Sequence, residues 1–246
     1  MKLSFFEEFP TKENLEKLKL ITFKAKLYVA AYSLKEFEAI KTKNKKIELV
    51  YWPLLQRKEG YWISPFSKRT ALLRIFNELT EKNVPIMLDL ELPTTRNPWL
   101  YLTQLSNFCR NKTLIKQFLK NRPGTYTAEY YPQGNLQESC LTLLGVHYSP
   151  NRYGTNVIKM LYHSFHHFDN QFLSNTLTMG KKKYGSNFLI GYGCIGFGVM
   201  GNEAQLSAEQ LQRDLEIARQ CGIEEVVIFR LGGMTKEYVS ILKLFS

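Results

Sequence analysis

The sequence predicts a single (β/α)₈ TIM barrel that spans residues 1–246 as one domain. Short apolar runs rich in aromatic and β-branched residues alternate with longer amphipathic runs along the chain. This alternation favours a parallel sheet with helices outside it, and eight such pairs in 246 residues are typical of the barrel. A doubly wound open sheet is the alternative. No linker, low-complexity segment or further repeat divides the chain.

Eight apolar runs are read as strands, because each is short and bounded by turn residues or charges. The strands are expected at Leu3–Phe9, Leu27–Ala31, Ile47–Trp52, Pro85–Leu92, Tyr126–Tyr131, Val157–His163, Phe188–Gly193 and Glu225–Leu231.

Capping residues mark the helices between these strands. Thr11 precedes the first helix, Ser33-x-x-Glu36 and Ser207-x-x-Gln210 are capping boxes, and Gly222 is placed to end a helix. The segment 150–154 is expected to be a loop. The helices are expected at 11–20, from Ser33 onward, at 67–82, at 98–120 with a break near Asn111, and at 136–146, 167–181, 207–220 and 235–244.

The composition narrows the kinds of partner. The formal net charge is +11, and a basic balance can indicate a nucleic-acid partner. The cations are spread out, however, and the lysines at 41–46 and 181–183 stand where helices are expected to end. A solvated basic surface is therefore favoured, and nucleic acid is a possible partner that is not favoured.

The four cysteines, Cys109, Cys140, Cys194 and Cys221, form no Cys-x-x-Cys motif, which favours a reducing compartment. Glu7 and Glu8 interrupt the apolar start of the chain, so a signal peptide is not indicated. The apolar stretch at 188–200 is glycine-rich and too short to span a bilayer. We expect a cytoplasmic protein without a membrane partner.

The fourth strand ends in the most informative feature, Asp89-Leu90-Glu91. Successive side chains of a strand alternate between its faces, so both carboxylates point the same way. A carboxylate within an apolar strand needs a partner or a raised pKa. Asp89 and Glu91 are therefore candidate catalytic residues, and an internal salt bridge from Asp89 to Arg230 is the structural alternative.

Other strand ends carry polar and aromatic residues as well, and the active sites of barrels lie at these ends. Glu8 and Glu129 are further candidate catalytic residues. Each polar residue also has a structural interpretation: Glu8 and Glu203 as helix caps, His163 as a hydrogen-bonded interior residue, and Trp52, Tyr61 and Trp62 as packing. The candidate substrate-binding residues are Trp52, Tyr131, Tyr162, His163, Tyr192 and Arg230, with His166 close by.

Glycines follow the seventh and eighth strands, where many barrels bind phosphate. Gly232 and Gly233 precede a helix start, so they are candidates for holding an anion with backbone N–H groups. The alternative is a tight turn or a close backbone crossing. The tract 191–201 matches a dinucleotide fingerprint twice, but no helix is expected directly after it. We expect no cofactor.

The Asp-x-Glu at the end of the fourth strand resembles the motif of muramidase-type and chitinase-type barrel glycoside hydrolases. The resemblance implies that Glu91 is the general acid and Asp89 its helper. The muramidase type also has an acid on the first strand, where Glu7 and Glu8 stand. The chitinase type has two more aspartates upstream, where this chain has Met87 and Val84.

The sequence therefore favours a glycoside hydrolase-like barrel enzyme that acts on a carbohydrate or a phosphorylated small molecule. One alternative is a metal-dependent or phosphate-binding isomerase or endonuclease, in which Glu8, Glu129, Asp89, Glu91 and His163 converge on a divalent cation. No His-x-x-x-His or Asp-x-His spacing supports it, and no metal ligand is assigned. The other alternative is a non-catalytic sugar-binding barrel. The oligomeric state stays open.

Overall fold

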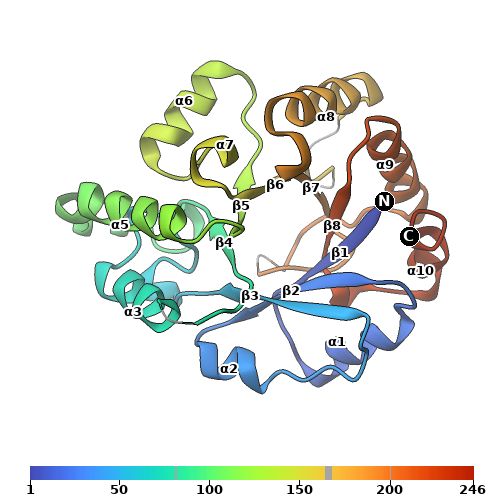
Figure 1. Cartoon of the computed structure of the whole chain (residues 1–246), viewed down its shortest axis with the longest axis horizontal. Coiled ribbons are helices and arrows are strands. Elements are labelled where there is room, and N and C mark those ends of the chain that lie inside the picture. The colour runs from blue at the N-terminus through green and yellow to red at the C-terminus, as the bar shows by residue number, and fades with distance from the viewer. Residues whose placement is uncertain (81, 164–167, 200) are drawn as a thin grey trace. The chain divides into compact units, whose positions relative to one another are not determined.

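The computed structural model describes residues 1–80, 82–163, 168–199 and 201–246. Eight strands form one sheet in the order β3-β2-β1-β8-β7-β6-β5-β4, and a parallel bridge from Tyr51 to Ile86 joins β3 to β4. This cyclic order confirms the predicted (β/α)₈ barrel. The strands are β1 (Lys2–Glu7), β2 (Ala25–Ala31), β3 (Ile47–Pro53), β4 (Met87–Leu90), β5 (Tyr126–Tyr130), β6 (Asn156–Met160), β7 (Phe188–Gly193) and β8 (Glu225–Phe229) (Figure 1).

Helices separate the strands, as the alternation predicts. Short 3₁₀ turns supplement them at η1 (Lys17–Leu20), η3 (Pro93–Thr95), η4 (Leu105–Asn107) and η6 (Leu231–Gly233). The α-helices are α1 (Lys12–Glu16), α2 (Leu34–Ala39), α3 (Arg69–Leu79), α4 (Leu100–Thr103), α5 (Phe108–Asn121), α6 (Asn135–Leu144), α7 (Pro150–Tyr153), α8 (Asn170–Tyr184), α9 (Ala208–Gln220) and α10 (Lys236–Leu242).

The caps predicted at Thr11, Ser207 and Gly222 form, whereas the Ser33-x-x-Glu36 capping box forms only in half. The Ser33 hydroxyl accepts the Glu36 N–H at 3.2 Å, but the Glu36 carboxylate accepts the Tyr32 N–H at 2.9 Å in place of the Ser33 N–H. The Thr11 hydroxyl accepts a hydrogen bond from the Asn14 N–H at 3.2 Å. At the start of α9, Ser207 and Gln210 make both halves of the capping box. Gly222 follows α9 with φ +71°, a left-handed conformation that favours glycine. Local sequence therefore decides where these helices begin and end.

Three local predictions need correction. The helical region 98–120 breaks at Gln104 and not near Asn111. Asn111 lies inside α5 and is fully buried, and it donates hydrogen bonds to the Pro65 and Ser67 carbonyls at 2.9 and 3.0 Å. The segment 150–154 contains α7, whose first residue is Pro150, a favoured helix-starting residue. The predicted start of α8 at His167 lies outside the described residues, and α8 is described from Asn170 onward.

The described chain groups into two compact units. Unit 1 comprises Met1–Ala30, Ile40–Val50 and Ile158–Ser246, and unit 2 comprises Ala31–Ala39 and Tyr51–Val157. In unit 1 the two chain ends meet, because the Met1 amino group donates a hydrogen bond to the Phe245 carbonyl at 3.1 Å (Figure 1). Among the described helices, none is long and apolar enough to cross a membrane.

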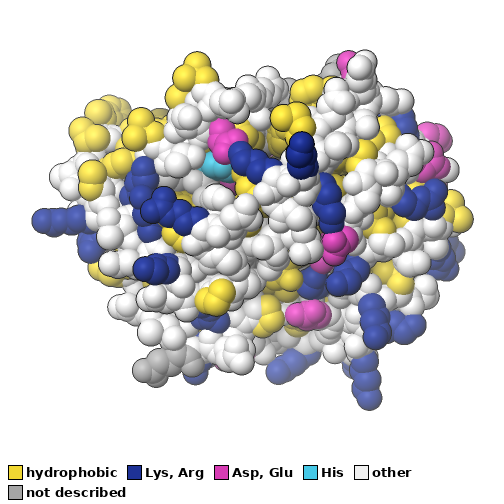
Figure 2. All heavy atoms as spheres, turned by 45° about the horizontal axis from the view of Figure 1, so that its top comes forward, with side chains coloured by type: hydrophobic (Ala, Val, Ile, Leu, Met, Phe, Trp, Pro, Cys, Tyr) yellow, Lys and Arg dark blue, Asp and Glu magenta, His cyan; other side chains and the backbone are white. Residues whose placement is uncertain are grey.

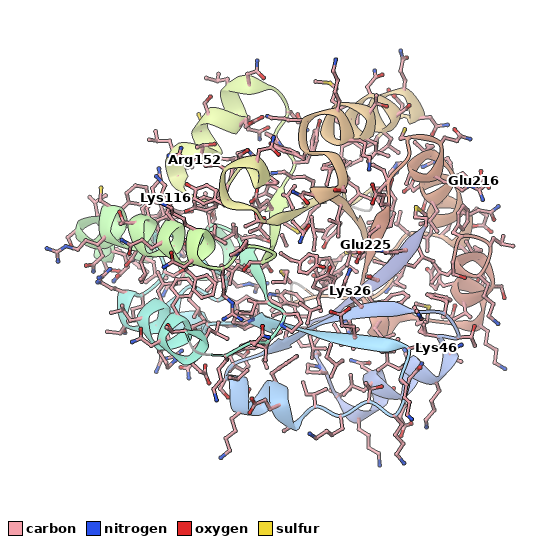
Figure 3. The ribbon with its side chains drawn as sticks, in the orientation of Figure 1. Lys26, Lys46, Lys116, Arg152, Glu216 and Glu225 are labelled. Atoms are coloured by element: carbon pink, nitrogen blue, oxygen red, sulfur yellow. The ribbon has the colours of Figure 1, made fainter. Side chains whose placement is uncertain are left out.

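In unit 1, alternation along β1 sorts its side chains onto two faces. Ser4 and Phe6 share one face: the Ser4 hydroxyl donates to Glu225 at 2.7 Å, and the Phe6 ring lies 5.4 Å from that of Tyr28. On this face Lys26 and Glu225 point toward each other, with an ion pair of 2.5 Å (Figure 3). Glu8 follows Phe6 by two residues, so alternation assigns it to the same face, whereas Glu7 points to the opposite face.

In unit 2, the register between β4 and β5 positions the acidic residues. Asp89 pairs with Ala128, and Leu90 pairs with Glu129. Neighbouring residues of paired parallel strands share a face, so Asp89 lies on the same face as Ala128 and, two residues on, Tyr130. Glu129 points to the other face. This alternation decides which groups can meet at the end of β4.

We predict that Gly180→Ala destabilises the protein, although alanine is the better helix former. A Cβ at position 180 of α8 would overlap the Phe188 ring of β7. Overpacking costs about 1–3 kcal/mol, against a gain in helix propensity of about 1 kcal/mol. The melting temperature measures the balance. Met179→Ala, at an exposed position of the same helix, is the control and should change stability by less than about 0.5 kcal/mol. A higher melting temperature for Gly180→Ala would contradict this packing.

Candidate functional site

The carboxyl pair of Asp89 and Glu91 stands at the end of β4. Asp89 is 4% exposed, and its backbone carbonyl accepts a hydrogen bond from the Ile63 N–H at 2.9 Å. Glu91 is the first residue beyond the strand and is half-buried. The Tyr130 hydroxyl, from the end of β5, donates to Glu91 Oε2 at 2.5 Å. The two carboxyl groups also share a hydrogen bond.

Burial controls the protonation of Glu91. Loss of hydration raises its pKa above 4.5, while hydrogen bonds from Tyr130 and Asp89 and the positive charge of Arg96 act in the opposite direction. Burial and the negative charge of Glu91 also raise the pKa of Tyr130, so Tyr130 remains a hydrogen-bond donor. The site therefore contains a carboxyl group that holds its proton to higher pH than an exposed glutamate does.

Arg96, whose positive charge lowers the pKa of Glu91, packs against two aromatic rings. The Arg96 guanidinium lies over the rings of Trp62 and Tyr61, at 5.5 and 5.7 Å from their centres. Both rings are buried and contact each other edge to face at 5.3 Å. Tyr61 has φ +65°, an unusual conformation for a bulky residue. Tyr61 and Trp62 therefore act through packing, and Trp52, at 3% exposed, is buried as well.

Glu129 does not join this pair, because it occupies the opposite face of β5. It is fully buried, and its Oε1 accepts hydrogen bonds from the Thr127 hydroxyl at 2.9 Å and the Tyr148 N–H at 3.2 Å. Its Oε2 lies 2.8 Å from His147 Nδ1, and Glu138 of α6 lies 3.3 Å from the other ring nitrogen. His147 is not recognisable as a site residue from the sequence, because it follows a helix instead of a strand.

In unit 1, Arg230 pairs with Glu7. Arg230 Nη1 donates to Glu7 Oε1 at 2.9 Å, and the guanidinium lies over the Phe9 ring at 4.9 Å. The same Glu7 oxygen accepts the Phe9 N–H at 2.8 Å. Burial raises the pKa of Glu7, and the charge of Arg230 opposes that shift. The ion pair of Arg230 is therefore with Glu7, which corrects the suggested salt bridge to Asp89.

The predicted phosphate loop has its N–H groups already bound. The Gly232 N–H donates to Glu7 Oε2 at 2.6 Å, and the Gly233 N–H donates to the Arg230 carbonyl at 3.0 Å. A Cβ on Gly233 would run into the backbone of Ile195. These glycines permit a close backbone crossing, and a carboxylate of the chain itself occupies the anion position. The expectation of a phosphorylated substrate loses its main support.

The other residues predicted for the site each have their own contacts and degree of burial. His163 is 6% exposed, and its Nδ1 lies 3.3 Å from the buried carboxyl group of Asp214 in α9, so it is held in the interior by a polar contact. Tyr192 is fully buried, which raises its pKa well above 10.0. Tyr162 is half-buried and packs on Phe229 at 5.7 Å. Glu8 is 5% exposed and Tyr131 is half-buried. His166 lies outside the described residues.

The acidic and histidine side chains of the described residues do not gather into a metal site. Within residues 1–80, 82–163, 168–199 and 201–246, no three histidine, cysteine, aspartate or glutamate side chains cluster as a cation site would require. The metal-dependent alternative therefore has no assembled donor set in the described part of the chain.

Comparisons with solved structures support the fold. The C-terminal domain of a chitinase candidate from Desulfitobacterium hafniense DCB-2 matches with a TM-score of 0.56 and 10% identity, over 99% of this chain and 97% of that one. The PgaB (BpsB) glycoside hydrolase domain from Bordetella bronchiseptica matches at 0.54 and 8%, over 93% of each chain. The 3-keto-D-glucoside 4-epimerase YcjR from E. coli matches at 0.53 and 14%, over 100% and 98%.

At these identities the comparisons establish the barrel fold alone, and the fold hosts many reactions. No family model and no curated protein matches the sequence. The chemistry therefore has to be argued from the residues of the site.

We predict that Glu91→Gln makes the protein more stable at neutral pH. A carboxyl with a raised native pKa stabilises the fold least when it is ionised, so the wild type loses stability as pH rises from 4.5 through the native pKa of Glu91. The uncharged variant avoids this loss, by about 1.4 kcal/mol per unit of pKa shift. Denaturant unfolding across pH measures the difference, which should vanish below pH 4.5.

Glu59→Gln provides a control of opposite sign. Hydrogen bonds from Arg74 lower the pKa of Glu59, so its contribution to stability is present above pH 4.5 and is lost as pH falls. This variant should be less stable than the wild type at neutral pH. Equal or lower stability of Glu91→Gln at neutral pH would show that burial of Glu91 carries no cost.

Proposed function

We propose that the chain is a glycoside hydrolase-like barrel enzyme in which Glu91 is the general acid and Asp89 assists it. One observation carries the proposal: a half-buried carboxyl group with a raised pKa, hydrogen-bonded to a second carboxyl group and to the Tyr130 hydroxyl, at the carboxyl end of a barrel strand. The names of two structural neighbours, a chitinase candidate and a glycoside hydrolase domain, are consistent with it.

The chemistry of glycoside cleavage requires these properties. The oxygen of the leaving sugar must receive a proton as the bond breaks, so the acid must be protonated near the working pH. Burial raises the pKa of Glu91 and so favours its protonated form, while the hydrogen bonds from Tyr130 and Asp89 oppose that shift. Tyr130 orients the Glu91 oxygen that it contacts.

A second carboxylate is needed as base or nucleophile. Asp89 is the proposed group in unit 2, since it lies on the same face of β4 as Glu91. Glu129 is the weaker proposal, because both its oxygens already have partners and it faces away from Asp89. A carbohydrate is the proposed substrate, and a barrel that only binds sugar is the alternative that experiment must separate.

We predict that Glu91→Gln lowers hydrolysis of the active members of an oligosaccharide panel at least about 100-fold, because it removes the proton donor. Release of reducing sugar measures turnover, and calorimetry measures oligosaccharide binding to the same protein. Glu129→Gln and Glu59→Gln are matched carboxyl-to-amide controls, and each should retain more activity than Glu91→Gln. Binding without turnover by the wild type would support the non-catalytic barrel instead.

We predict that Tyr130→Phe moves the alkaline limb of the pH–activity profile to higher pH. The hydrogen bond from Tyr130 lowers the pKa of Glu91, so its loss leaves the acid protonated over a wider range. The pH dependence of kcat/KM on the best oligosaccharide measures the shift. Tyr101→Phe, which removes a hydroxyl 2.6 Å from that of Thr94, is the control. An unchanged or acid-shifted limb in Tyr130→Phe would remove Glu91 from the role of general acid.

A further inference from the structure

The segment that follows the candidate site has an unusual distribution of charge. From Leu92 to Ala128 the sequence contains no aspartate or glutamate, although the chain has 22 of them. The same segment contains six cations: Arg96, Arg110, Lys112, Lys116, Lys120 and Arg122. This stretch of unit 2 therefore carries formal charges of one sign only.

The same segment exposes three large apolar side chains. Trp99, Leu102 and Leu105 are 71%, 68% and 65% exposed, and they recur every third residue through α4 and η4. The inner side of this stretch is packed: Leu100 is 4% exposed, and the Tyr101 ring lies 4.7 Å from that of Phe66. We call Trp99, Leu102 and Leu105 the apolar ridge. Large apolar side chains grouped in this way are typical of an interaction surface.

Basic groups accompany the ridge. Arg110 and Lys120 of α5 are exposed, and Lys116 of the same helix is half-buried. Figure 3 labels Lys116 on α5. An open hollow of about 350 Å³ lies along α5 and is lined by Arg69, Cys109, Arg110, Thr113, Leu114 and Gln117. It contains two guanidinium groups and no carboxylate. Figure 2 shows basic and hydrophobic side chains side by side over the region of α5, on the left of the view.

We propose that the apolar ridge and the cations of α5 dock the protein onto an anionic lipid surface. Trp and Leu side chains insert at the boundary between head groups and acyl chains, and Lys and Arg attract the anionic head groups. Arg69 and Arg110 are placed to hold a lipid phosphate in the hollow between them. No spanning helix is required, because the ridge enters only the interface.

Charge favours a lipid surface over the other occupants. A second copy docked through the same face would bring the exposed cations of α5, Arg110 and Lys120, toward like charges of its partner. A nucleic acid would meet only one ring for stacking, that of Trp99, beside two leucines that cannot stack. A bilayer of anionic lipids offers negative head groups to the cations and an apolar boundary to the leucines. This proposal is independent of the reaction proposed for Glu91.

Tryptophan fluorescence offers a direct test, because Trp99 is the exposed tryptophan while Trp52 and Trp62 are 3% and 8% exposed. Vesicles of phosphatidylcholine mixed with phosphatidylglycerol should shift the emission to the blue, protect it from iodide, and carry the protein in a flotation assay. Vesicles of phosphatidylcholine alone should bind far less. Added salt should weaken binding by screening the head groups.

Variants separate the two parts of the surface. The triple change Leu102→Ser, Leu105→Ser and Trp99→Ala should weaken vesicle partitioning by about tenfold or more. Arg110→Gln and Lys120→Gln should each weaken it by about fivefold. The matched controls are Leu244→Ser and Lys41→Gln, at exposed positions of unit 1, which should bind as the wild type does. Circular dichroism confirms that each variant is folded.

Three results would overturn the proposal. The first is equal binding to neutral and anionic vesicles, or binding to neither. The second is full vesicle binding by the folded ridge variant. The third is a concentration-dependent dimer that the ridge variant abolishes, which would assign the ridge to a second copy of the chain.

Discussion

The two-residue alternation of the strands is the constraint on which the candidate site depends. Because the register pairs Asp89 with Ala128, Asp89 shares a face with Tyr130 and is separated from Glu129. A shift of one residue between β4 and β5 would exchange these partners. The contact between Glu91 and Tyr130 therefore follows from the strand register, whereas the pairing of Asp89 with Glu91 follows from alternation along β4 itself.

Glu7 and Glu91, one buried and one half-buried, illustrate how surroundings assign different roles to the same kind of side chain. Burial raises the pKa of both Glu7 and Glu91. Glu7 binds Arg230 and the Gly232 N–H, so it fastens the turn after β8 to β1 and fills the position that a phosphate would need. Glu91 is hydrogen-bonded to Tyr130, which keeps its own proton, and to a second carboxyl group, that of Asp89. A carboxyl group with a proton to give, placed at a strand end, is the one suited to acid catalysis.

The chain that follows β4 unites two features of unit 2. It supplies Arg96, whose charge acts on Glu91, and three residues later it begins the apolar ridge at Trp99. Loops at the carboxyl ends of barrel strands commonly carry function, because the strands hold their ends in place. If the ridge binds a lipid surface, the same loop would bring the candidate site close to that surface. A substrate presented there would then be favoured over one that diffuses freely.

The sequence by itself determined the order of the strands and helices, the caps at Thr11 and Ser207, and the shared face of Asp89 and Glu91. These depend on periodicity and on contacts between residues close in the chain, which a single sequence displays. The tertiary structure alone decided which distant groups meet: Arg230 with Glu7, Glu129 with His147, and Tyr130 with Glu91. Such partners depend on register and on side-chain packing between elements. The break before α5 was misplaced for the same reason, because Asn111 looks like a helix-breaking residue until the carbonyls of Pro65 and Ser67 are seen to bind it.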